Sequence, residues 1–207
     1  PVYEGQLMNR YDHRAKTYKG FPMSRKYGPK PGIPATDDGE KASPHFEIEP
    51  RYWMLEEVAA ERLERRLGDR AIFAFRDVTR PSTDRRCAKG ALLPRYPASD
   101  TLPLLGVGSR SLEFCGVFNS TSFDFLVRGK MPGGNVKTTW MLSQIAAPLP
   151  GLDARIAENV RKLSATSSVI AGEFGCEPRP WGPVERVKLA LGTHALDSNT
   201  YDVTATE

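Results

Sequence analysis

The sequence predicts a mixed α+β fold, in which a domain with a small sheet carries a helical appendage at its C-terminal end. Two short apolar runs, at 71–75 and 87–93, have the length and composition of strands. Residues 54–67 and 152–171 show apolar residues at helical spacing. A chain of 207 residues is long enough to bury a core. We therefore expect an α/β domain over 1–150 and a helical segment over 151–207.

The first half of the chain is expected to contain one long loop, one helix and two strands. Gly, Pro, Asp and Lys dominate residues 19–50, which predicts a long exposed loop. Residues 54–67 predict a helix with apolar residues on one side and Glu/Arg pairs on the other. The run 71–75 predicts a buried strand that ends at Arg76, and 87–93 predicts a second strand.

The second half is expected to be helical. Residues 112–127 are apolar on most sides, which predicts an internal helix interrupted at Asn119 and Ser120. A short helix is expected at 138–145, and a long one with a single apolar stripe at 152–171. A last helix at 184–191 would begin after Pro183. The last two would pack as a hairpin or extend away from the rest.

Positive charge is concentrated before residue 138, although the net charge is only +4. Residues 1–30 hold seven Lys and Arg against two Asp and Glu, and residues 76–95 hold six against two. Residues 151–207 hold six against eight. Basic segments favour a polyanionic partner, because Lys and Arg that neutralise phosphates release condensed counterions. The alternative is an ordinary solvated basic face.

No catalytic or metal-binding motif is recognised in the chain. The three histidines lack metal-ligand spacing, and the three cysteines are odd in number and widely separated. The glycines at 106 and 108 lack the third glycine of a nucleotide fingerprint. No apolar run is long enough to span a bilayer, and the first residues do not resemble a signal peptide, so a cytoplasmic location is expected.

Residues 128–137 form the most suggestive loop. Arg128, Lys130 and Lys137 surround Gly133-Gly134 with no acidic residue between them. Glycines leave backbone N–H groups approachable, and the basic side chains favour an anion. The loop is therefore a candidate phosphate contact, and a plain surface turn is the alternative.

Two clusters place an Asp beside an Arg. The first is Tyr11-Asp12-His13-Arg14, and the second is Arg76-Asp77, which precedes Arg80, Arg85 and Arg86. An Arg oriented by a carboxylate is suited to grip a phosphate or to read guanine through two hydrogen bonds. The same pairs also fit internal salt bridges that fix a loop, and both interpretations stay open here.

A series of motifs carries a family resemblance over nearly the whole chain. They are Tyr3-Glu4-Gly5, Tyr11-Asp12-His13-Arg14, Pro50-Arg51-Tyr52-Trp53, Phe75-Arg76-Asp77-Val78-Thr79 and Phe118-Asn119-Ser120 with Phe123-Asp124. In order and spacing the chain resembles the C-terminal target-recognition region of adenine-specific DNA methyltransferases. These are the enzymes of Eco57I-like and type IIG restriction-modification systems and related phage-defence methylases. The polar end, Leu196 to Val203, departs from that pattern.

The resemblance implies a recognition module for double-stranded DNA. Its parent would bind S-adenosylmethionine and carry the catalytic Asn-Pro-Pro-Tyr/Phe motif in a methyltransferase domain, in cis or in trans. Neither motif is present here, so this chain alone should be inert and need no cofactor. The expected DNA-backbone contacts are Arg14, Arg80, Arg85, Arg86, Arg128, Lys130 and Lys137. Structural roles are expected for Asp12, His13, Asp77, Asn119 and Asp124.

Two other functions remain as alternatives. A non-catalytic assembly module would dock a methyltransferase to a partner subunit through helices at 152–191. A metal-dependent nuclease domain would use the acidic cluster between Asp37 and Lys41.

Overall fold

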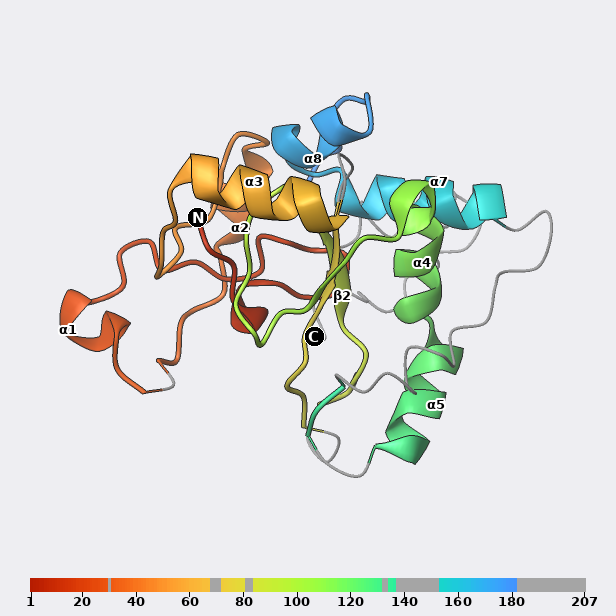
Figure 1. Ribbon diagram of the computed structural model, residues 1–207, viewed down its shortest axis with the longest axis horizontal. Helices are drawn as coiled ribbons and strands as arrows, with labels where there is room; N and C mark the ends of the chain where they lie inside the picture. The colour runs from red at the N-terminus through yellow and green to blue at the C-terminus, as the bar shows by residue number, and fades with distance from the viewer. Residues whose placement is uncertain (30, 68–71, 81–83, 132–133, 137–152, 182–207) are drawn as a thin grey trace.

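The chain has an α+β fold in which helices surround a three-stranded antiparallel sheet (Figure 1). The computed structural model describes residues 1–29, 31–67, 72–80, 84–131, 134–136 and 153–181. The strand order is β2-β1-β3, with β1 at Ile72–Phe75, β2 at Gly90–Leu93 and β3 at Leu104–Leu105. The strands predicted at 71–75 and 87–93 are confirmed as β1 and β2, and both are shorter than predicted. The third, only two residues long, was not predicted.

Both faces of the sheet are covered, so every residue of β1 and β2 is buried. Phe73 and Phe75 pack into a cluster with residues of the helices. Ala74 points to the opposite face and joins a second cluster with Tyr3 and Tyr18 from the N-terminal segment. Strands buried on both faces are continuously apolar rather than alternating, which is why these runs were easy to recognise.

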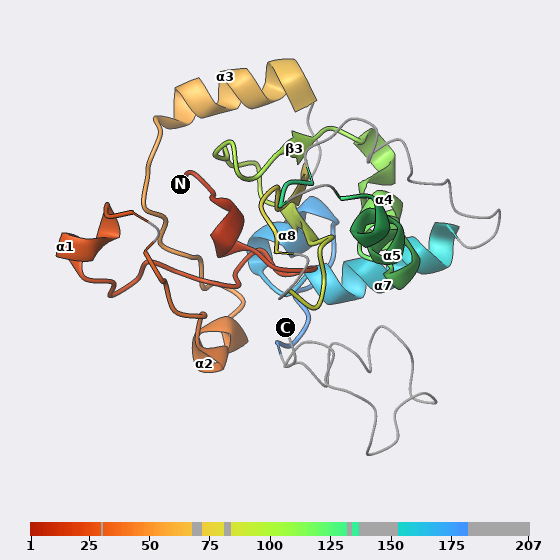
Figure 2. The ribbon, with the colours of Figure 1, turned by 90° about the horizontal axis from the view of Figure 1, so that it is seen from below.

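One face of the sheet is covered by three helices: α4 at Ser111–Phe118, α5 at Thr121–Lys130 and α7 at Asp153–Ser164 (Figures 1 and 2). The stretch expected as one interrupted helix at 112–127 is two separate helices. Ser120 begins α5, because its side chain accepts a hydrogen bond from the N–H of Phe123 at 3.1 Å.

The long helix expected at 152–171 is also divided. α7 ends at Ser164, and α8 runs from Ser168 to Glu173. Ser167 caps α8 by accepting a hydrogen bond from the N–H of Ile170. A serine at this position offers the chain an alternative to continuing the first helix.

The described part of the C-terminal segment shares the core of the sheet. α7 lies directly against α4 at Gly116, where an added Cβ would collide with the side chain of Ile156. Val160 belongs to the same cluster as Phe73. Helix α7 therefore packs in the same core as the sheet. The helices expected at 138–145 and 184–191 lie outside the described residues.

The prediction of a long exposed loop at 19–50 is confirmed only in part, because much of the segment is irregular and exposed but some of it is helical or buried. This segment contains two short helices, α1 at Met23–Lys26 and α2 at Asp38–Ala42, and follows a 3-10 turn at Gly5–Leu7. Ile33 and Ile48 are buried in the cluster on the second face of the sheet. A few apolar side chains among many glycines and prolines are enough to hold the segment against the sheet.

The predicted helix at 54–67 is confirmed as α3, which spans Glu56–Leu67. Figure 2 shows α3 on a different side of the molecule from the group formed by α4, α5 and α7. Ala59 and Leu63 are its buried side chains. None of the helices in the described ranges has both the length and the apolar character needed to cross a bilayer.

Candidate nucleic-acid interface

The loop between β1 and β2 is folded around Asp84. One carboxylate oxygen of Asp84 accepts hydrogen bonds from the Thr79 hydroxyl and from the Arg80 N–H, both at 3.0 Å. The Lys89 ammonium lies 3.6 Å from the same oxygen. Burial opposes ionisation of Asp84, but the Arg80 N–H and Lys89 hold its pKa below the ordinary value. The carboxylate therefore fixes the loop.

Helix α5 is joined to the same loop through Asp124. Its Oδ1 accepts hydrogen bonds from the N–H groups of Cys87 at 2.6 Å and Ala88 at 2.9 Å. One turn later, Arg128 Nη2 donates to the carbonyls of Asp84 at 2.8 Å and Arg85 at 2.7 Å. Two side chains of α5 thus pair with backbone groups of the loop.

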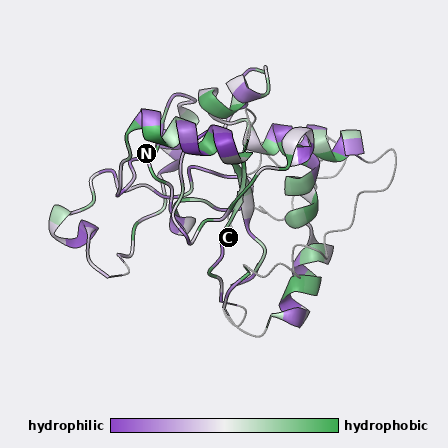
Figure 3. Cartoon of the chain, in the orientation of Figure 1, coloured by the Kyte–Doolittle hydropathy of each residue, from purple (hydrophilic) through white to green (hydrophobic). Residues whose placement is uncertain are grey.

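The loop and α5, which these contacts join, carry several basic side chains that we call the arginine ridge: Arg80, Arg85, Arg86, Arg128 and Lys130. Arg80, Arg85 and Lys130 are exposed, while Arg86 and Arg128 are partly covered. Arg86 lies 3.8 Å from Asp124. Among the described residues, neither Arg80 nor Arg85 forms an ion pair. The C-terminal turn of α5 is correspondingly hydrophilic in Figure 3.

The glycine loop after α5 returns to the same region. The N–H of Thr79 donates to the carbonyl of Gly134 and the N–H of Val136 to that of Asp77, both at 2.8 Å. The Asn135 amide donates to the Asp77 carboxylate at 3.3 Å. Lys137 lies outside the described residues. The anion-binding role of this loop stays a prediction.

Arg14 is not at this surface, which corrects its assignment as a DNA-backbone contact. Its side chain is fully buried. Nη1 donates to the carbonyls of Ser43 and Phe46, both at 3.0 Å, and Nη2 donates to those of Lys41 at 3.2 Å and Thr166 at 2.9 Å. The guanidinium therefore ties together distant segments of the chain and presents no donor to DNA.

The neighbours of Arg14 have similar contacts. Asp12 accepts a hydrogen bond from the Arg14 N–H at 2.9 Å and forms a buried ion pair with Lys41 at 2.8 Å. His13 Nε2 lies 3.1 Å from the hydroxyl of Ser167, the residue that caps α8. These side chains connect the N-terminal segment to α2 and to the start of α8.

Asn119 joins α4 to the sheet. Its amide donates to the Gly90 carbonyl at 2.8 Å, and its side-chain oxygen accepts from the Gly90 N–H at 2.9 Å. The same amide also donates to the Cys115 carbonyl at the end of α4, at 3.0 Å. Asn119 thus satisfies backbone groups of both elements, and it positions α5 for its contact with the loop.

A basic cleft lies between the N-terminal segment and the loop that follows β1. Its volume is about 680 Å³, and its lining includes Lys16, Thr36, Arg76, Lys89 and Trp181. Sequence reasoning counted these charges but did not bring Lys16 together with Arg76 and Lys89, because they belong to different segments. The indole of Trp181 lies over Lys41 at 4.1 Å and donates to Asp38 at 2.8 Å.

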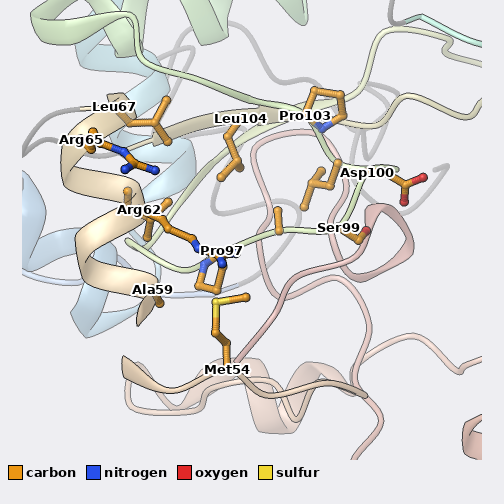
Figure 4. Close-up of a pocket in the computed structure, with 13 residues that line it drawn as sticks. Met54, Ala59, Arg62, Arg65, Leu67, Pro97, Ser99, Asp100, Pro103 and Leu104 are labelled. Carbon is orange, nitrogen blue, oxygen red and sulfur yellow. The ribbon is translucent and has the colours of Figure 1, made fainter. Parts of the chain in front are cut away.

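A second cavity, of about 710 Å³, separates α3 from residues 97–104 (Figure 4). Ala59 and Leu67 line it from α3, and Pro97 and Leu104 line it from the other side. Arg62 also points toward this space from α3 in the same view. No motif in the sequence pointed to this cavity.

The acidic cluster at residues 37–41 is engaged in other contacts. Asp37 accepts the N–H of Gly39 at 2.8 Å and caps α2, Asp38 accepts from Trp181, and Glu40 pairs with Lys19 at 2.7 Å. In the part of the chain that the structure describes, no three His, Cys, Asp or Glu side chains gather as metal ligands would.

The buried thiols are poor nucleophiles. Burial raises the pKa of Cys87 and of Cys115. A thiol with a raised pKa carries little thiolate at neutral pH, and the thiolate is the reactive form.

No protein-family model matches this chain, and neither a curated protein nor a solved structure is significantly similar to it.

Proposed function

We propose that the chain is a sequence-recognition module for double-stranded DNA, the target-recognition part of an adenine-N6 DNA methyltransferase or restriction-modification enzyme. The arginine ridge carries the proposal. Its acidic neighbours, Asp84 and Asp124, bind backbone N–H groups of the loop, so two arginines beside them face solvent without an ion pair among the described residues. The motif order described above supports the methyltransferase parent, whose catalytic domain and S-adenosylmethionine site would lie outside this chain.

The ridge has the chemistry that DNA phosphates require. A guanidinium offers its donors in a planar fork that matches two phosphate oxygens. The side chain of Arg128 is held by two carbonyls, which reduces the entropy that it loses on binding. Phosphate contacts set the position of a protein on DNA, and a smaller number of base contacts specify the sequence. The ridge supplies the first kind of contact.

The test is the salt dependence of DNA binding by the 207-residue chain, measured by mobility shift with and without magnesium. Each neutralised phosphate contributes about −0.9 to the slope of log affinity against log salt. The double variant Arg80→Gln/Arg85→Gln should therefore flatten the slope by about two units. The matched control is Arg110→Gln/Arg155→Gln, which removes the same charge from exposed positions on η2 (Gly108–Arg110) and α7.

Each possible result is informative. A slope that flattens only in the ridge variant supports the proposal. Equal flattening in the control, or no binding at low salt, contradicts it. Magnesium-dependent cleavage that Asp38→Asn removes would support the nuclease alternative instead.

A second candidate, the assembly module, is favoured by an exposed apolar surface. Tyr52, Trp53 and Leu55 precede α3 and are 45%, 66% and 74% exposed. The ring of Tyr27, also exposed, lies 5.9 Å from that of Tyr52. Exposed apolar patches are typical of protein interfaces. This surface is a better docking site for a methyltransferase domain than α7, which packs against α4.

The two candidates differ in one measurement. An assembly module without a DNA role predicts that the isolated chain does not shift duplex DNA at low salt. It also predicts that Trp53→Ser/Leu55→Ser abolishes co-elution with the methyltransferase domain. DNA recognition predicts a shift that the same double variant leaves unchanged.

A further inference from the structure

The basic cleft concentrates positive charge at one corner. Lys16, Arg76 and Lys89 all line it, and the N–H of Arg76 donates to the carbonyl of Lys89 at 3.0 Å, which keeps these two residues together. Lys89 has Asp84 at 3.6 Å, and its side chain is only 10% exposed. Among the described residues, Lys16 and Arg76 form no ion pair. Three cations thus share one carboxylate.

Like charges held together are unfavourable unless an anion offsets them. Burial lowers the pKa of Lys16, and Arg76 and Lys89 lower it further. Burial also lowers the pKa of Arg76, which Asp84 opposes. Clefts in which burial and specific charges perturb titratable groups are frequent binding sites.

The other carboxylates of the cleft do not neutralise this corner. Asp12 is paired with Lys41 at 2.8 Å. Asp37 caps α2, and Asp38 accepts from the indole of Trp181. Among the described residues, Asp84 is therefore the only carboxylate that forms an ion pair with Lys16, Arg76 or Lys89.

A buried hydroxyl adds a second observation. Thr36 is 6% exposed and lines the cleft, and its Oγ1 has no hydrogen-bond partner among the described residues. The backbone of Thr36 donates to the Ala15 carbonyl at 3.0 Å, and Ala35 pairs with Lys16, so Thr36 lies beside Lys16 in the fold. A buried polar atom left without a partner costs stability, which a ligand that pairs with it would recover.

We infer that the basic cleft binds the phosphate group of a nucleotide-sized molecule, with Lys16, Arg76 and Lys89 neutralising the charge and Thr36 donating its hydroxyl. A cavity of about 680 Å³ has the size of small-molecule sites and cannot admit a duplex. The phosphate is carried either by a free mononucleotide or by a single strand. The inference stands without the arginine ridge, because none of its basic residues belongs to that surface.

The test titrates the 207-residue chain at low ionic strength with inorganic phosphate, adenosine monophosphate and a short single-stranded oligonucleotide, by calorimetry. Thr36→Val keeps a side chain of similar shape and removes only the hydroxyl, so it should weaken binding roughly tenfold. Lys16→Gln should weaken it by a similar factor or more. The matched control, Lys19→Gln, alters an exposed lysine paired with Glu40 and should bind as the unchanged chain does.

A second measurement separates a specific site from general attraction. A phosphate beside Lys16 should raise its pKa, which side-chain nuclear magnetic resonance detects, while Lys19 should not respond. A thermal midpoint of Thr36→Val that equals that of the unchanged chain would show that the variant is folded. Tighter binding of adenosine monophosphate assigns the phosphate to a free nucleotide, and tighter binding of the oligonucleotide assigns it to a strand.

The absence of binding by the unchanged chain at millimolar phosphate would overturn the inference. Equal losses in Lys16→Gln and Lys19→Gln would also overturn it, because they would indicate nonspecific attraction. Its failure is distinguishable from that of the proposed function: Arg80→Gln/Arg85→Gln should leave phosphate binding in the cleft intact while it weakens duplex binding.

Discussion

Residues 1–30 and residues 76–95 carry similar excesses of positive charge, but the fold buries Arg14 and Lys26 of the first segment and exposes Arg80 and Arg85 of the second. Arg14 is fully buried and Lys26 is 7% exposed. Arg80 and Arg85 are exposed. Local charge therefore does not decide whether a basic residue meets a partner. Whether a basic side chain is available to a partner depends on the groups within the protein that accept its hydrogen bonds.

Those acceptors differ between the two segments. In the first, carbonyls from residues 41–46 and 166 surround Arg14, so the guanidinium itself holds the loops together. In the second, Asp84 and Asp124 bind the loop backbone. These two carboxylates hold the loop in place, and the neighbouring Arg80 and Arg85 remain exposed. The same side chain is a structural element in one segment and a candidate ligand contact in the other.

The largest expected effect is a loss of stability when the buried arginine of the first segment, Arg14, is replaced. Arg14→Met should lower the free energy of unfolding by about 3–5 kcal/mol, because it removes the cation that faces Glu47 and leaves four carbonyls without a donor. Chemical denaturation of the full chain measures this loss. Arg80→Gln, on the exposed segment, should stay within about 0.5 kcal/mol of the unchanged chain.

Equal stability of the two variants would show that the buried contacts of Arg14 do not distinguish the segments. A large loss of stability in Arg80→Gln alone would show that the second segment, and not the first, depends on its arginine for stability.

The next largest effect is a loss of stability when Asp124, which holds the loop of the second segment, is replaced. Asp124→Ala should cost about 2–3 kcal/mol, because it leaves the buried N–H groups of Cys87 and Ala88 without an acceptor. It should also weaken DNA binding, since the loop that carries Arg85 loses its connection to α5. The matched control is Asp153→Ala, which removes a partly exposed carboxylate paired with Arg110. Stability that is unchanged in Asp124→Ala would show that α5 does not hold the loop.

The sequence predicts the apolar elements well and the polar contacts poorly. The strands β1 and β2 and the helix α3 are recognisable because their patterns depend on neighbours within a few residues. The interruption at Asn119 and Ser120 was predicted, but the partner of the Asn119 side chain, Gly90, lies 29 positions away. The partner of Arg14 at Thr166 is 152 positions away. No local pattern encodes contacts of that kind.

The candidate site follows the same rule. Arg80, Arg85 and Arg128 were named from local basic segments and from the family resemblance, but the link between α5 and the loop depends on hydrogen bonds across 43 and 44 positions. The basic cleft was missed because its residues come from separate segments. The burial of Arg14 was missed because a motif that contains an Arg beside an Asp looks the same whether it faces solvent or the core.

The smallest effect concerns Glu47, the carboxylate that faces Arg14 inside the first segment. Neither of its oxygens has a hydrogen-bond partner among the described residues. Burial raises the pKa of Glu47 from 4.5 to about 7, although Arg14 opposes the shift. Between these two values the folded chain holds a proton that the unfolded chain has released, so stability falls as the pH rises through this range.

Glu47→Gln should remove this pH dependence, because the amide does not ionise. The variant should match the unchanged chain below about pH 4.5 and exceed its free energy of unfolding by about 1 kcal/mol near neutral pH, after allowance for partial exposure of the group. Denaturant unfolding at several pH values measures the difference, with the exposed Glu57→Gln as the control. A constant offset at every pH would mean that Glu47 does not titrate in this range. The pairing with Arg14 would then keep the carboxylate ionised, and the first segment would be held by a true buried ion pair rather than by carbonyls alone.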